Sequence, residues 1–229
     1  MSYLFRRLIS GREEPGIRLI VFDFDGTLAD TRELLLRIVS KHLLSFEISL
    51  TKNMVKFFGN VPLWDYVSLA GVPSKLVRSV HSAIVDDFME EYHKIKPCKN
   101  LMTLKSLNIR KVIVSNNQTS FIEKSLDFLK ANFFEGVYGA DKFENKVIMI
   151  DSLHRKYGLL PEEIIYVGDK DVDVDVARDV GCYSVIIAGK SAWSSRADIL
   201  KKKPDYALTD LGKLSEVIAQ LNAEQLPAI

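Results

Sequence analysis

The chain has 229 residues, enough for one large hydrophobic core and a smaller second unit. Its 31 basic and 30 acidic residues nearly cancel, and a net charge of +1 gives no electrostatic footprint for nucleic acid or an anionic membrane. Two distant cysteines, Cys98 and Cys182, do not make a disulfide framework, and no apolar run approaches the roughly 20 residues of a membrane span, so we expect a cytoplasmic protein.

Glycine and proline separate residues 1–16 from the first apolar run of the core, so we expect a loose arm there. That run, Leu19 to Phe22, is too short for a helix and contains β-branched residues. This pattern is typical of a buried strand in a parallel sheet. The first predicted element is therefore a central strand.

This strand ends in two acids. Asp23 and Asp25 are two positions apart, so both carboxylates leave on one side at the carboxyl end of the strand, where open α/β sheets bind ligands. Gly26 lets the backbone turn sharply. Two like charges this close need a cation, a shared proton or strong hydrogen bonds. On repulsion alone, replacing Asp23 by Asn is expected to leave stability unchanged or slightly raised.

Between residues 31 and 95 apolar residues recur at helical spacing and no strand-like run occurs. Asp30 and Glu33 resemble a capping box at the start of the first helix. The expected helices span 32–44, 51–58, 63–69 and about 74–95. We therefore predict an all-helical cap, residues 31–95, inserted into a core made of residues 1–30 and 96–229.

From Pro97 helices and strands alternate, which predicts an α/β fold with a Rossmann-like parallel sheet. Strands are expected over 112–115, 137–138, 164–167 and 184–187, with a last strand and helix pair over 206–221. Helices are expected over 101–107, 120–129, 145–157 and 172–180. Ser120 and Glu123 offer a capping box for the second of these helices.

Further chemistry-bearing side chains follow the later strands. Ser115 ends a strand, where its hydroxyl can hold a phosphoryl oxygen. Lys142 and Lys146 lie just before and at the start of the helix expected at 145–157, and either ammonium could neutralise carboxylates and phosphate. Gly168 and Asp169 end another strand, and further aspartates follow at positions 171, 173 and 175. An EF-hand loop would also alternate acids in this way, but its required glycine is Val174 and its twelfth residue is Val180.

The run of four hydrophobic residues followed by Asp, any residue, Asp, Gly and Thr at positions 19–27 resembles the first motif of the haloacid dehalogenase-like superfamily of phosphotransferases. Ser115, Lys146 and the Asp169–Asp173 pair resemble its other three motifs, in the same order. The resemblance implies a two-step phosphoryl transfer in which Asp23 attacks phosphorus, while Asp25 protonates the leaving oxygen and then activates water.

The same resemblance implies a Mg²⁺ cofactor held by Asp23, Asp169 and the backbone carbonyl of Asp25, with Asp173 as an outer ligand. It also implies that a small phosphorylated metabolite is the substrate. We expect Gly26, Thr27 and Asn116 to contact the phosphoryl group, and expect a monomer or homodimer without nucleic-acid or membrane partners.

Residues 55–71, VKFFGNVPLWDYVSLAG, resemble the specificity segment of phosphoglycolate phosphatase-like members of this superfamily. Lys56, Asn60 and Trp64 are therefore candidate substrate contacts, although core packing explains Trp64 equally well. Three alternatives remain open: a phosphomutase, a phosphonatase that forms a Schiff base with a cap lysine, and a non-catalytic phosphate-binding protein. The lysines available for a Schiff base are Lys52, Lys56, Lys75 and Lys94.

Overall fold

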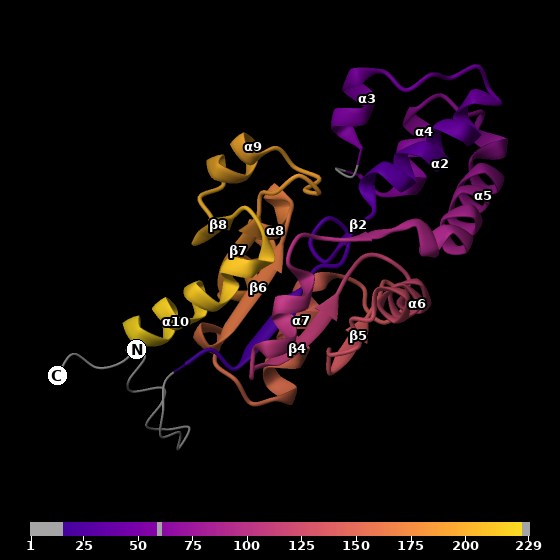
Figure 1. Cartoon of the computed structure of the whole chain (residues 1–229). Helices are drawn as coiled ribbons and strands as arrows, with labels where there is room; N and C mark the ends of the chain where they lie inside the picture. Colours follow the sequence, from indigo (N-terminus) through magenta and orange to yellow (C-terminus); the bar gives the residue numbers. More distant parts are fainter. Residues whose placement is uncertain (1–15, 59–60, 226–229) are drawn as a thin grey trace.

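A computed structural model describes residues 16–58 and 61–225 (Figure 1). A six-stranded sheet has the order β5-β4-β1-β6-β7-β8, and every neighbouring pair is parallel. The predicted Rossmann-like α/β core is confirmed, whereas the predicted N-terminal arm lies almost wholly outside the described residues. The strands are β1 (Leu19–Phe22), β4 (Arg110–Val114), β5 (Gly136–Tyr138), β6 (Ile164–Gly168), β7 (Tyr183–Ile187) and β8 (Tyr206–Leu208).

Helices cover both faces of the sheet. Ile20 and Phe22 of β1 belong to a core cluster with Phe121 of α6, while Leu19 and Val21 belong to a second cluster that includes Ile150 of α7. Successive side chains of a strand point to opposite faces, so this alternation buries β1 on both sides. The helices of the core are α6 (Thr119–Leu129), α7 (Lys146–Lys156), α8 (Asp171–Val180), α9 (Arg196–Lys201) and α10 (Leu214–Glu224), with short 3₁₀ turns at Leu101–Ser106, Pro161–Glu163 and Leu211–Lys213.

The remaining helices gather beyond the sheet, at the upper right of Figure 1. They are α2 (Arg32–Leu44), α3 (Lys52–Phe57), α4 (Leu63–Leu69) and α5 (Val77–Glu90), with 3₁₀ turns at Ser74–Leu76 and Glu91–Lys94. We call residues 32–94 the helical unit. It occupies the place of the predicted cap, whose status as a separate domain stays a prediction. None of the described helices is long and apolar enough to cross a membrane.

Two short strands that the sequence pattern did not reveal lie at the base of the helical unit. These strands, β2 (Ala29–Asp30) and β3 (Lys96–Pro97), pair antiparallel, so the chain enters and leaves the unit side by side. Two residues are too few to show a period of two.

Both predicted capping boxes are wrong. Asp30 lies in β2, and Thr31, which precedes α2, makes no side-chain capping bond. Helix α6 begins at Thr119, whose backbone N–H and hydroxyl both donate to Asp141 Oδ1, at 2.8 and 2.7 Å. A carboxylate from a distant loop therefore replaces the local cap at a helix N-terminus that favours negative charge.

Two helices end in the left-handed conformation with different residues. Gly181 after α8 has φ of 81°, and Lys130 after α6 has φ of 56°. A Cβ at Gly181 would meet only Pro161 Cβ, at an ordinary 3.7 Å. The two positions therefore isolate the backbone cost of a side chain in this conformation.

We predict opposite effects for two substitutions. Gly181→Ala should lower the free energy of unfolding by about 1 kcal/mol, and Lys130→Gly should raise it by about 0.5 to 1 kcal/mol, because only glycine avoids the left-handed penalty. Urea denaturation of the two variants beside the wild type measures both effects. Changes of the same sign would contradict this explanation.

Candidate active site

Asp23 lies at the carboxyl end of β1 with only 2% of its surface exposed. The backbone N–H of Phe24 donates to its Oδ1 at 2.7 Å, and the Lys146 ammonium donates to its Oδ2 at 2.7 Å. Burial raises the pKa of Asp23, but Lys146 together with the charge of Lys170 and the Phe24 N–H more than offsets this, so the pKa lies below its ordinary value. Asp23 is therefore held as a carboxylate.

Lys146 is the first residue of α7, which Asn145 caps by accepting a 2.9 Å hydrogen bond from Ile148 N–H. Its buried ammonium also lies 2.8 Å from the Tyr166 hydroxyl and 3.5 Å from Asp173 Oδ1. Burial lowers the pKa of Lys146, but Asp23 and Asp173 together raise it above its usual range. Lys142, by contrast, is exposed and lies 3.4 Å from Asp141.

Asp173, in the first turn of α8, is anchored through both oxygens. Its Oδ1 accepts a hydrogen bond from the Tyr166 hydroxyl at 3.1 Å, and its Oδ2 accepts from the backbone N–H groups of Asp169 and Lys170 at 3.0 and 2.9 Å. A Cβ at Gly168 would lie 2.3 Å from Asp173 Oδ2, so only glycine fits there. Asp173 therefore fixes the turn that carries Asp169.

Asp169 is fully buried after β6. Its Oδ1 accepts a hydrogen bond from the Thr27 hydroxyl at 3.0 Å, and its Oδ2 accepts from the backbone N–H of Trp193 at 2.7 Å. Burial and the nearby Asp173 and Asp23 raise its pKa well above the ordinary value, although Lys170 opposes them. Gly26 has φ of 76°, and a Cβ on it would lie 2.3 Å from Asp169 Oδ2. The hydroxyl of Thr27 therefore holds the Asp169 carboxylate in place.

Asp25 is half-buried and accepts hydrogen bonds from Asn117 Nδ2, at 3.1 and 3.3 Å to its two oxygens. Burial first, and then the charge of Asp23, raise its pKa above the ordinary value. Ser115 is buried at the end of β4, where its Oγ accepts a 3.4 Å hydrogen bond from Asn117 N–H. Asn116, the expected substrate contact, is exposed. Its neighbour Asn117 bonds both Asp25, after β1, and Ser115, after β4, and so links the ends of these two strands.

The structure describes two of the three expected substrate contacts of the helical unit, Lys56 and Trp64. Lys56 is exposed on α3, Trp64 is 42% exposed beside His81, and Asn60 lies outside the described residues. Phe58, the residue after α3, is buried and stacks on Trp193 with ring centroids 5.3 Å apart. Neither aromatic was singled out in the sequence.

The donor set fits a hard divalent cation. Carboxylate oxygens of Asp23, Asp169 and Asp173 lie within 4.8 Å of one another, and Mg²⁺ prefers oxygen ligands. Burial and the charges of Asp173 and Asp23 raise the pKa of Asp169 despite Lys170, and a bound cation would oppose that shift.

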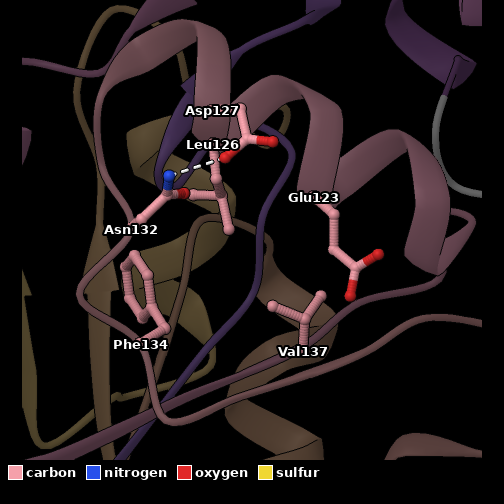
Figure 2. A pocket seen from close by; sticks show the side chains of 6 residues that line it. All are labelled: Glu123, Leu126, Asp127, Asn132, Phe134 and Val137. Atoms are coloured by element: carbon pink, nitrogen blue, oxygen red, sulfur yellow. Dashed lines mark hydrogen bonds between the residues drawn. The ribbon is translucent and has the colours of Figure 1, made fainter.

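A pocket of about 330 Å³ lies between α6 and β5 (Figure 2). Asn132 donates a 2.6 Å hydrogen bond to Asp127 at its edge. The lining residues are Glu123, Leu126, Asp127, Asn132, Phe134 and Val137. None of them is a candidate residue, so the chemistry indicated by the sequence lies elsewhere.

Comparisons with known proteins support the motif analysis. A sequence model described as haloacid dehalogenase-like hydrolase matches residues 20–187. The phosphoglycolate phosphatase of Vibrio cholerae is 26% identical, the match covering 88% of this chain and 97% of that protein. The pyrophosphatase PpaX of Bacillus mycoides is 25% identical, over 90% of this chain and 99% of that protein. A haloacid dehalogenase-like hydrolase from Streptococcus pneumoniae has the same fold, with a TM-score of 0.75 and 22% identity over 89% of this chain and 98% of its own.

The environments of Asp23 and Asp25 predict opposite effects on stability in metal-free buffer at pH 7. Asp23→Asn should lower the free energy of unfolding by about 2 kcal/mol, because buried Lys146 loses its nearest carboxylate. This reverses the expectation from repulsion alone. Asp25→Asn should raise it by up to about 1 kcal/mol, because an amide avoids the cost of ionising beside Asp23. Chemical denaturation checks both variants, and equal shifts would contradict the assigned environments.

Proposed function

The chain belongs to the haloacid dehalogenase-like hydrolase family as a phosphatase, and we propose that it hydrolyses a small phosphomonoester with Mg²⁺ through an aspartyl-phosphate intermediate. One observation carries this proposal. Two carboxylates side by side, Asp23 and Asp25, have pKa values shifted in opposite directions. A carboxyl group with a lowered pKa suits a nucleophile, and one with a raised pKa suits a general acid.

In this proposal Asp23 Oδ attacks phosphorus and forms the acyl phosphate while the bond from phosphorus to the leaving oxygen breaks. Asp25 gives its proton to that oxygen, and then takes a proton from the water that hydrolyses the intermediate. Lys146 lies against Asp23 and offsets the negative charge that the substrate brings. Ser115, at the end of the neighbouring strand β4, is assigned to hold a phosphoryl oxygen. Gly26, Thr27 and Asn116, which follow Asp25 and Ser115 in the sequence, are assigned to contact the phosphoryl group.

We assign the metal to Asp23, Asp169 and the backbone carbonyl of Asp25. Bound there, Mg²⁺ would neutralise phosphoryl oxygens and the surrounding carboxylates. Asp173 offers oxygens to the same group, but they accept four hydrogen bonds, from two backbone N–H groups, the Tyr166 hydroxyl and the Lys146 ammonium, whereas Asp23 and Asp169 accept two each. We therefore propose that Asp173 positions Lys146 and Asp169 rather than binding the metal directly.

No observation favours the alternative functions. The cap lysines that a phosphonatase would need to bury are exposed: Lys52, Lys56, Lys75 and Lys94. The named relatives act on phosphoglycolate or pyrophosphate, which makes both compounds the first candidates for the substrate. A cytoplasmic location and a monomer or homodimer remain part of the proposal.

The test is phosphate release from p-nitrophenyl phosphate, phosphoglycolate and pyrophosphate. We expect turnover with Mg²⁺ and none in excess chelator. Lys146→Ala should lose nearly all activity because its ammonium contacts Asp23, whereas Lys142→Ala should keep most of it because a surface charge is worth under about 1 kcal/mol. Full activity in chelator, or equal losses in the two lysine variants, would refute the proposed site.

A further inference from the structure

Lys170 follows Asp169 directly and is fixed beside the candidate active site. Its backbone N–H donates to Asp173 Oδ2 at 2.9 Å. Its half-buried side chain places the ammonium 4.9 Å from the centroid of the Trp193 ring. This is a cation–π contact, which holds a positive charge in place without neutralising it.

The two lysines at the site, Lys146 and Lys170, have different partners. The Lys146 ammonium donates hydrogen bonds to Asp23, Tyr166 and Asp173. Within residues 16–58 and 61–225, no group accepts a hydrogen bond or forms an ion pair with the Lys170 ammonium. It nevertheless lies close enough to lower the pKa values of Asp23, Asp25 and Asp169. Lys170 is therefore a cation at the site with three unused hydrogen-bond donors.

The ring that holds Lys170 is itself fixed. The backbone N–H of Trp193 donates to Asp169 Oδ2 at 2.7 Å, and its ring stacks on Phe58 with an interplanar angle of 18°. Trp193 lies in the loop between β7 and α9, and Phe58 follows α3 in the helical unit. Lys170 thus stands where the helical unit meets the catalytic edge of the sheet, beside the reacting groups.

We propose that Lys170 binds a second anionic group of the substrate, one that carries a single negative charge such as a carboxylate. This inference rests on the proposed function, in which Lys146 and Ser115 serve the reacting phosphoryl group and leave Lys170 free. One unpaired ammonium matches one negative charge. The substrate class is then a small phosphorylated carboxylic acid, and Lys170 is a specificity-determining residue.

A different role for Lys170 would be general charge balance among the carboxylates. Charge balance would affect every phosphate ester alike, whereas a carboxylate subsite affects only esters that carry the carboxylate. Phosphoglycolate and ethyl phosphate form a matched pair, because they are similar in size and differ in that group. Comparing the two esters therefore separates the two roles.

The experiment measures kcat/KM for both esters in wild type and Lys170→Gln. We expect a loss of at least about tenfold with phosphoglycolate, as for a lost bond between charged groups, and under about threefold with ethyl phosphate. Lys156→Gln is the control, because exposed Lys156 also lies over a ring, that of Tyr157 at 5.3 Å, at the opposite end of α7 from Lys146. It should change neither value. Equal losses for both esters, or no loss for either, would overturn the inference.

Binding separates this inference from the proposed function. In an Asp23→Asn background with Mg²⁺, calorimetric titration with phosphoglycolate should give a Kd at least about tenfold weaker when Lys170→Gln is added. If the wild type hydrolyses neither ester and the Asp23→Asn pair still shows this shift in Kd, the function is refuted and the subsite is kept. A wild type that hydrolyses both esters, with an unchanged Kd, would refute the subsite alone.

Discussion

The contact between the Lys146 ammonium and the Asp23 carboxylate is the interaction on which the site depends. Asp23, Asp169 and Asp173 are all buried, and three carboxylates in such a place repel one another strongly. Lys146 offsets that repulsion because, as the first residue of α7, it reaches Asp23 after β1 and Asp173 after β6. The strand order β4-β1-β6 thereby brings four separate sequence motifs together at one edge of the sheet.

Similar residues around this contact have different roles because their surroundings differ. Asp23 is held ionised by Lys146, whereas Asp25, two residues later, has its pKa raised by burial and by Asp23 itself. Lys146 is saturated with partners, while Lys170 rests on an aromatic ring. The proposed chemistry divides along the same lines: one acid attacks and the other carries protons, and one lysine serves phosphate while the other selects the substrate.

Local sequence was enough to predict the residues that follow strands, because the carboxyl ends of parallel strands meet at one edge; Asp23, Asp25 and Asp169 were found in this way. The residue pattern alone left Lys142 and Lys146 open, and the family resemblance favoured Lys146. In the fold it is Lys146 that contacts Asp23, whereas Lys142 lies beside Asp141. Tyr166 was missed because a tyrosine inside an apolar strand looks like core packing. Trp193 lies 24 residues after Asp169 in a loop without periodicity. The capping box at α6 failed because Asp141, distant in sequence, bonds the first residue of the helix, and the one at α2 failed because Asp30 lies in β2.

Direct detection of phosphorylated Asp23 tests the central claim. Asp25→Asn should still react with p-nitrophenyl phosphate, whose leaving group needs little protonation, but should hydrolyse the intermediate slowly, since general base help is worth roughly 10² to 10⁴ in rate. Rapid acid quenching followed by mass spectrometry should show one added phosphoryl group on the peptide containing Asp23, with a burst of nitrophenol. Steady turnover without a burst and without an adduct on that peptide would contradict the account.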